Sequence, residues 1–392
     1  MARRVFLHVG SPKTGTTFLQ KVLWSQPQVT RDQGLLLPGT RFFDHFRATM
    51  DLRQVHKPGW DEEGFSGAWT RLVQEADAWD GDVLVSHELL VGATDEQARR
   101  ACESFAAAEV HVVVTARDLG RQIPAAWQEN VKHKSAIGFT EFVQAVRTGG
   151  RQANWFWRAQ DPAGIVGRWC TSLPTGHAHV ITGPRADQPS DMLWRRFAGV
   201  LGVDADAFDL ELGRSNASLG AAQAQLLRAV NQVRGSRLSA PGVYPAMVKE
   251  LLTHQVLAGQ PKQQFGLSQD DWRWAVQEAE AVVESLAATS AVIVGDLDEL
   301  VPSTPRSHAD PASVTPGAIV DAAADSLVEV LSLLQQERVD AHQRITELSA
   351  ATRARHLRRG LRRALGRSGT LPAQRHAPRR SGVGVIHPEP NR

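Results

Sequence analysis

The sequence predicts an α/β fold in three layers, with a central parallel sheet flanked by helices. Five short apolar runs have the length and composition of strands. They are residues 5–9, 35–39, 82–88, 110–117 and 178–183. Helical patterns such as 16–26 and 191–202 separate most of these runs. Strands that alternate with helices form crossover units, whose parallel sheet is buried on both faces.

The first strand leads into a loop with the spacing of a nucleotide-phosphate loop. In "GSPKTGTT" four residues separate Gly10 from Gly15, as in a Walker loop, which makes the predicted fold P-loop-like. Thr16 stands where the Walker lysine belongs, and Lys13 lies inside the loop. Backbone N–H groups and the helix dipole bind an anion at such a turn. Because Lys13 lies early in the loop, its ammonium suits a ligand with a short anhydride of one phosphate and one transferable group better than it suits a triphosphate.

Two later strands end in residues suited to catalysis and anion binding. The run 82–88 ends in His87 and Glu88, and the run 110–117 ends in Arg117, followed by Asp118. Open α/β sheets bind ligands beyond the carboxyl ends of their strands. His87 and Glu88 are both candidate general bases, and we expect one of them to face the site because neighbouring strand residues point to opposite faces. A structural hydrogen-bonding role is the alternative for each.

The second half of the chain is predicted to be mainly helical. We expect a main domain over 1–302, whose helical part, 219–300, covers one side of the sheet or forms a cap. A Pro/Ser-rich linker over 303–319 and a helix over 320–350 follow. Apolar residues from Leu327 to Leu348 at alternating four- and three-residue steps, apart from Arg338 in one slot, suggest that this helix forms a coiled coil and a homodimer. Residues 351–392 form an Arg-rich tail that we expect to be disordered.

Charge and composition indicate a protein of the cytoplasm. The tail holds eleven arginines and one glutamate, although the net charge of the chain is only +2. Such a tail suits an anionic membrane surface, so we expect a cytoplasmic protein that associates peripherally with the inner membrane face, without specific nucleic-acid binding. Two cysteines form no disulfide framework, and no run is long enough to span a membrane.

At the loop the sequence resembles a known family. "PKTGTT" followed by Phe18 is similar to the 5′-phosphosulfate loop of the sulfotransferases that use 3′-phosphoadenosine 5′-phosphosulfate (PAPS). The resemblance implies that Lys13 contacts the bridging oxygen and the sulfuryl group, and that Phe18 lies near the adenine. It also implies a set of ligands for the 5′-phosphate, namely Thr14, Gly15, Thr16 and Thr17.

The same resemblance assigns Arg117 to the 3′-phosphate. Eight residues later the family usually has a serine, but this chain has Ala125. Either other donors assist Arg117 or the cofactor site is weakened; the nearby candidates are Arg121, Gln122 and Gln128. His87 matches the catalytic histidine of the cytosolic members, and other branches use a glutamate, which Glu88 would supply.

The resemblance implies a PAPS-dependent sulfotransferase acting on a hydroxyl of a carbohydrate, glycolipid or small molecule. The alternatives are a P-loop nucleotide kinase or NTPase, and a non-catalytic nucleotide-binding protein with a membrane-surface tail. We predict no metal, because the histidines offer no constellation; those considered are His111, His133, His177 and His179. Two further stretches have weaker signals. A loop with Arg214, Ser215 and Asn216 would close over the nucleotide or cap the following helix. Trp155, Trp157 and Trp169 would form a wall for the acceptor or pack in the core.

Overall fold

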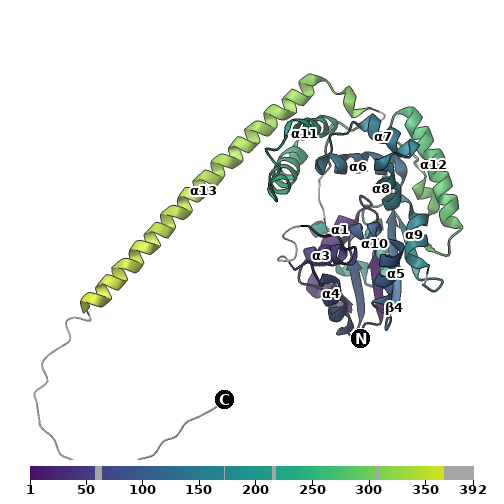
Figure 1. The fold of residues 1–392 in the computed structure, drawn as a ribbon, viewed down its shortest axis with the longest axis horizontal. Coiled ribbons are helices and arrows are strands. Elements are labelled where there is room, and N and C mark those ends of the chain that lie inside the picture. The colour runs from purple at the N-terminus through teal and green to yellow at the C-terminus, as the bar shows by residue number, and fades with distance from the viewer. Residues whose placement is uncertain (58–63, 172, 214–217, 306, 308, 366–392) are drawn as a thin grey trace, which may run out of the picture. The chain divides into compact units, whose positions relative to one another are not determined.

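A computed structural model describes most of the chain. It covers residues 1–57, 64–171, 173–213, 218–305, 307 and 309–365 (Figure 1). The chain forms two compact units, Met1–Val328 and Glu329–Arg392. The first unit holds the sheet and most helices, and the second holds the greater part of a long C-terminal helix.

The described strands form one parallel sheet, which confirms the predicted fold class. Their order across the sheet is β2-β3-β1-β4-β5-β6. The strands are β1 (Arg4–His8), β2 (Leu35–Leu36), β3 (Asp82–Ser86), β4 (Glu109–Ala116), β5 (Ala178–Thr182) and β6 (Val292–Val294). Each of the first five overlaps a predicted run, although β1 and β4 begin one residue before theirs. β6 lies inside the stretch expected to be helical, and it is a three-residue edge strand defined by pairing with β5.

Helices occupy most of the remaining described chain. The α-helices are α1 (Thr16–Trp24), α2 (Pro27–Asp32), α3 (Phe42–Leu52), α4 (Ala68–Asp77), α5 (Asp95–Glu103), α6 (Leu119–Lys132), α7 (Phe139–Thr148), α8 (Arg151–Gln160), α9 (Pro162–Cys170), α10 (Met192–Leu201), α11 (Ala221–Val233), α12 (Gln269–Ala287) and α13 (Pro316–Leu365). The short 3₁₀ segments are η1 (Glu88–Gly92), η2 (Ala205–Ala207), η3 (Glu211–Gly213), η5 (Leu257–Gly259), η6 (Leu297–Leu300) and η7 (Pro311–Ser313), and η4 (Pro245–Val256) is a π-helix.

Alternate residues of the central strands pack into two separate cores. Phe6, Leu84 and Val113 join the buried faces of α1 and α10. Their neighbours on the same strands, such as Leu7 and Val112, pack instead with α4, α5 and α9. This period of two follows from the pleat of a strand, and it produces the three layers that the sequence predicts.

A third core joins helices that lie together in Figure 1. It contains buried residues of α6, α7, α11, α12 and η4, including Trp127 at the centre of α6. The helical part predicted over 219–300 therefore contributes to a helical assembly, although it also contains β6. Because α6 follows β4 directly, this assembly is anchored at the carboxyl end of a central strand.

The C-terminal helix is longer than predicted. α13 runs from Pro316 to Leu365, whereas the sequence suggested 320–350. Its apolar side chains at Leu331, Leu334, Ile345 and Leu348 are exposed. Residues 366–392, which hold the rest of the predicted disordered tail, lie outside the described residues. Among the helices that the structure describes, none has the length and apolar character needed to cross a bilayer.

Candidate active site

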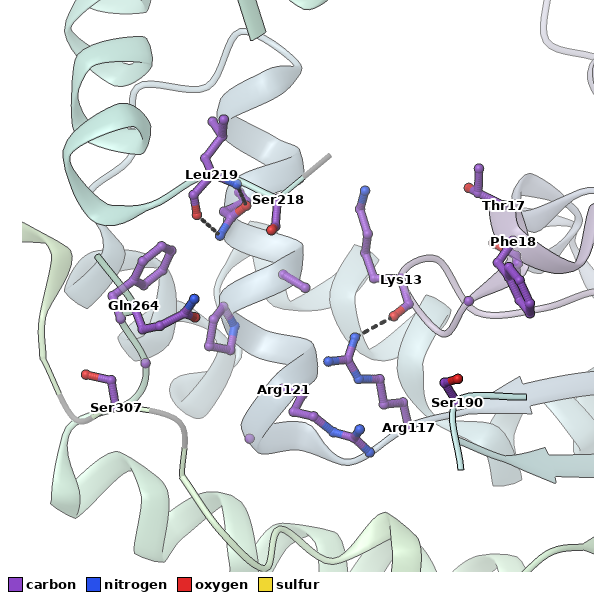
Figure 2. Close-up of a pocket in the computed structure, with 18 of the residues that line it drawn as sticks. Lys13, Thr17, Phe18, Arg117, Arg121, Ser190, Ser218, Leu219, Gln264 and Ser307 are labelled. Atoms are coloured by element: carbon purple, nitrogen blue, oxygen red, sulfur yellow. Dashed lines mark hydrogen bonds between the residues drawn. The ribbon is translucent and has the colours of Figure 1, made fainter. Parts of the chain in front are cut away.

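A pocket of about 820 Å³ lies beyond the carboxyl ends of the central strands. Its walls come from the loop after β1, from η1 after β3, from one side of α6 after β4, and from residues 264–267. Figure 2 shows Lys13, Arg117 and Leu219 around this space, although they are far apart in the sequence. The position is that of ligand sites in open α/β sheets.

The loop between β1 and α1 needs both of its glycines. Gly15 has φ of +103°, and a Cβ atom there would lie 2.4 Å from a methyl carbon of Leu193. At Gly10 a Cβ would lie 2.6 Å from Thr16 Cγ2. Gly15 is also the N-cap of α1, where no described side chain caps the first turn. The first N–H groups of α1 are therefore available to an anion, supported by the helix dipole.

A buried polar network supports the loop from below. The Thr14 hydroxyl donates to the Ser11 carbonyl at 2.6 Å and lies 2.6 Å from Thr115 Oγ1. Thr115 in turn lies 3.5 Å from His8 Nε2, and His8 Nδ1 lies 2.7 Å from Ser86 Oγ. Of the four residues expected to hold the 5′-phosphate, Gly15, Thr16 and Thr17 line the pocket, whereas the Thr14 side chain is buried in this network.

Lys13 is the cation of the loop, and it is paired. Its Nζ lies 2.5 Å from Glu129 Oε2 on α6, with 35% of the lysine side chain exposed. Its backbone has φ of +70°, which is uncommon for a residue with a Cβ atom. Burial opposes ionisation of Glu129, but Lys13, with help from His133 and Lys249, lowers the pKa of this carboxyl to about 2.

Further lysines surround this ion pair. Lys132 lines the pocket, and burial together with the charge of Lys13 lowers its pKa to about 8. The charges of Lys249 and Lys262 also act on Lys132. Four of the seven lysines of the chain thus influence one region. The pocket wall near α6 is strongly cationic, as a ligand with several negative charges requires.

Arg117 connects the two segments that the sequence predicts to bind anions. Its Nη1 donates to the carbonyl of Lys13 at 3.0 Å, and the residue lines the pocket (Figure 2). Arg121 also lines the pocket, but its guanidinium bonds Asp118 and donates to the Pro184 carbonyl at 2.8 Å. Arg117 therefore stabilises the loop at Lys13. Because Arg117 follows β4, it also lies beside the pocket.

The alternative donors for the 3′-phosphate differ in where they lie. Ala125 lines the pocket and supplies no hydroxyl there. Gln128 lines it too, but its amide exchanges two 3.1 Å hydrogen bonds with the backbone of Leu219. Gln122 is buried and donates to the Pro12 carbonyl at 2.6 Å, which holds the loop after β1.

His87 and Glu88 separate as expected for neighbours, and Glu88 is the one that lines the pocket. Glu88 Oε2 accepts a 2.8 Å hydrogen bond from the Thr16 hydroxyl. The buried His87 ring lies between Phe42 and Phe46, and its Nδ1 accepts from the Leu89 N–H at 3.1 Å. Burial, with His45 and Arg53, lowers the pKa of His87 to about 3, so its ring is neutral at pH 7.

Of the aromatic residues considered in the sequence, Phe18 lies at the pocket and the three tryptophans lie elsewhere. Phe18 lines the pocket, where its ring lies against Gly213. Trp169 is buried in the core, and Trp157 packs in the helical assembly with its indole N–H donating to Val146 O at 3.1 Å. Trp155 is 41% exposed. None of these three tryptophans is among the described residues that line the pocket. Residues 214–216 lie outside the described residues.

Some pocket residues were missed by the sequence analysis. They share a polar or charged side chain and come from distant segments: Lys132, Ser190, Gln264, Thr304 and Ser307. Glu129, the partner of Lys13, was missed as well. One signal existed for Glu129 and Lys132, because both follow Arg117 on the helix that was expected to lie beside the 3′-phosphate. The others carry no local motif.

The structure gathers histidines that the sequence analysis had considered separately. Among the described residues, Glu109, His111 and His177 place one potential ligand atom each within 4.8 Å of the others. No metal constellation had been expected, because Glu109 was not considered and the pairing of β4 with β5 was unknown. The group lies at the amino ends of these strands and therefore away from the pocket.

Comparisons with known proteins give one match. The sequence matches no protein-family model and no curated protein sequence. Among solved structures, the chain is similar to the crystal structure of a sulfotransferase from Alicyclobacillus acidocaldarius, with 18% identity and a TM-score of 0.38, over 54% of this chain and 85% of that chain. A likeness at this score supports no inference about the residues or the reaction of this chain.

Proposed function

We propose that the protein is a sulfotransferase that moves the sulfuryl group of PAPS to a hydroxyl of a carbohydrate, glycolipid or small molecule. The observation that carries this proposal is the joining of two cationic segments at one pocket. Lys13 lies within the glycine loop after β1, and Arg117 after β4 donates to its carbonyl at 3.0 Å. A nucleotide with charge at both its 5′ and its 3′ side would meet both segments.

The chemistry of the pocket wall suits such a nucleotide. The N–H groups at the start of α1, among them that of Thr16, and the hydroxyl of Thr17 would hold the 5′-phosphate. Arg117 would hold the 3′-phosphate through its forked donors. A volume of about 820 Å³ is within the usual range for ligand pockets. Phe18 offers an apolar surface for the adenine.

The proposed reaction is a single in-line displacement at sulfur. The oxygen of the acceptor hydroxyl forms a bond to sulfur as the bond from sulfur to the bridging phosphate oxygen breaks. The acceptor proton passes to a carboxylate of the protein, and adenosine 3′,5′-bisphosphate leaves. Lys13 would leave Glu129 to neutralise the charge that develops on the leaving oxygen. Positioning and charge stabilisation would supply most of the rate, as in phosphoryl transfer.

We favour Glu88 as the general base. It lines the pocket next to the loop, and its bond from Thr16 orients the carboxylate. The Nδ1 atom of His87 already accepts a backbone hydrogen bond, so the proton of the neutral ring belongs on Nε2, and no unshared lone pair remains to accept another. His87 is then a positioning residue that caps η1, the segment that begins with Glu88.

A non-catalytic nucleotide-binding protein is the second candidate, favoured by Ala125. The position has no hydroxyl for the 3′-phosphate, which fits a site that binds without turnover.

A kinase is disfavoured because Thr16 stands in place of the Walker lysine. In both the enzyme and the binding protein, the Arg-rich tail would bring the chain to anionic lipid. Cosedimentation with phosphatidylserine vesicles tests that proposal.

The experiment that tests the function uses the full chain, labelled PAPS and a lysate of source cells. The enzyme should transfer label to a hydroxyl-bearing molecule, and Lys13→Ala should lower the rate by at least about 100-fold, the usual cost of losing one charge-stabilising donor. The matched control is Lys57→Ala, at an exposed lysine outside the pocket. Nucleotide binding without any labelled product would favour the non-catalytic candidate. Near-normal transfer by Lys13→Ala would contradict the proposed mechanism.

A further inference from the structure

Three side chains with metal-ligand chemistry meet at the amino-terminal edge of the sheet. They are Glu109 and His111 of β4 and His177, which immediately precedes β5. The pocket lies beyond the opposite ends of these strands. β4 has eight residues, so the two locations are separated by roughly 25 Å of strand at about 3.3 Å per residue. This group is therefore independent of the proposed transfer reaction.

Strand geometry explains why the three side chains meet. Glu109 and His111 are two residues apart on β4 and therefore project from the same face. The Val112 N–H donates to the His177 carbonyl at 2.8 Å, which fixes β4 beside the segment that leads into β5. The His111 and His177 rings stack with centroids 4.5 Å apart and planes 13° apart. The backbone pairing thus determines the arrangement before any ion is bound.

The distances between the ligand atoms suit one small ion. Glu109 Oε1 lies 3.2 Å from His111 Nε2 and 3.4 Å from His177 Nε2. Ligands at about 2.0–2.1 Å from a tetrahedral zinc ion lie roughly 3.4 Å from one another. All three atoms are within 4.8 Å of each other, and the two stacked imidazole rings would turn relative to one another so that both Nε2 lone pairs point at the ion.

The nitrogen atoms that face the carboxylate are suited to be ligands. His177 Nδ1 lies 2.9 Å from the Val110 carbonyl, which only accepts, so this nitrogen carries the proton and Nε2 keeps a lone pair. His111 Nδ1 shares a hydrogen bond of 3.0 Å with His179 Nε2. His111 Nε2 is buried, and the Glu109 carboxylate lies beside it at 3.2 Å. Such outer hydrogen bonds orient metal-binding histidines.

From this geometry we infer that Glu109, His111 and His177 form a binding site for a divalent transition metal ion, with zinc as its best match. Two imidazoles and one carboxylate match the ligand preferences of zinc. The Glu109 side chain is 51% exposed, so solvent can fill a fourth position. Arg4 is the nearby positive charge, but its guanidinium is paired with Asp82 at 2.5 Å. A bound ion would tie β4 to β5 at the start of both strands.

The test measures zinc binding to the full chain after removal of metal with a chelator. Calorimetry with Zn²⁺ should give a high-affinity site that Glu109→Gln and His177→Gln each weaken by about 100-fold, because each removes one of three protein ligands. The matched controls are His56→Gln and Glu103→Gln, which are exposed and outside the cluster and should bind zinc as the wild type does. Zinc should also raise the melting temperature of the wild type, and at the same zinc concentration it should raise that of the two ligand variants less.

A second probe reports the geometry. Co²⁺ in place of zinc should give the visible absorption of a four-coordinate site, and Glu109→Gln should abolish it. Because Glu109 is half exposed, this variant should fold normally, and circular dichroism checks that it does. The proposal would be overturned if the wild type, Glu109→Gln and His177→Gln bound zinc with the same affinity.

Discussion

Lys13 and Glu129 form an ion pair at the pocket wall, with 2.5 Å between Lys13 Nζ and Glu129 Oε2. The lysine belongs to the loop after β1, and the glutamate belongs to α6. The pair holds the lysine side chain next to the site. A negatively charged ligand must compete with Glu129 for this ammonium, so the pair should set the affinity of the pocket for its nucleotide.

The first prediction concerns Glu129. Glu129→Gln removes the competing carboxylate and one negative charge beside the ligand, so adenosine 3′,5′-bisphosphate should bind up to about 5-fold more tightly, because one partly exposed ion pair contributes at most about 1 kcal/mol. Calorimetry measures this affinity. Glu141→Gln, at an exposed position on α7, is the control and should change nothing. Weaker binding by Glu129→Gln would show that the carboxylate positions Lys13 for the ligand rather than competing with it.

The second prediction separates the two candidate bases. Glu88→Gln should lower the rate of sulfuryl transfer by about 100-fold or more, because the amide cannot take up the acceptor proton. Nucleotide affinity should remain close to that of the wild type. His87→Asn keeps an oxygen that can accept from the Leu89 N–H, so it should retain most of the rate. The reverse outcome, with His87→Asn the inactive variant, would assign the base to the histidine.

The third prediction is a loss of stability in acid, caused by three buried histidines. Burial lowers the pKa of His8 to about 3, of His45 to about 4 and of His87 to about 3. In the unfolded chain these rings take up protons below about pH 6.5, whereas in the folded protein they stay neutral. The free energy of unfolding should therefore fall as the pH decreases from 6.5, by about 1.4 kcal/mol per pH unit for each histidine.

One variant isolates this effect. His87→Asn does not titrate, so its free energy of unfolding should depend less steeply on pH than that of the wild type between pH 6.5 and pH 5. Urea unfolding at several pH values measures the slope. His56→Asn replaces an exposed histidine and should leave the slope as it is. Equal slopes for all three proteins would mean that His87 is charged in the folded state.

The fourth prediction concerns the exposed seam of α13. Leu327, Leu331, Leu334, Ile345 and Leu348 are each at least 48% exposed, and with Arg338 and Ala341 they follow alternating four- and three-residue steps. Two copies of this helix would bury them as a short coiled coil. Light scattering should give the mass of a dimer, and Leu334→Asp with Ile345→Asp should give a monomer. Val339→Asp lies off the seam and should leave the dimer intact. A monomeric wild type would contradict the prediction.

The sequence predicted those parts of the fold whose signals are local. The runs that became β1, β3, β4 and β5 are apolar because both sheet faces are buried, and this pattern is readable without tertiary information. β6 was missed because a three-residue edge strand depends on its pairing with β5. The loop with Lys13 was located correctly because glycine spacing is also a local signal.

Other parts of the site depend on contacts that no local pattern records. The Thr14 hydroxyl turns inward because Thr115, about a hundred positions later, offers it a partner. The pairing of Lys13 with Glu129 depends on how α6 packs beside the loop. The register of β4 against β5 brings His111 to His177, whereas the sequence shows only histidines at separate places.

Calorimetric titration of the full chain with adenosine 3′,5′-bisphosphate tests most directly whether the pocket binds PAPS. The comparison ligands are adenosine 5′-monophosphate and ATP with magnesium. We predict that the bisphosphate binds at least about tenfold more tightly than either, and that Arg117→Ala removes this preference because the 3′-phosphate loses its charged partner. Tighter binding of ATP with magnesium, or a preference for the bisphosphate that survives in Arg117→Ala, would contradict the account.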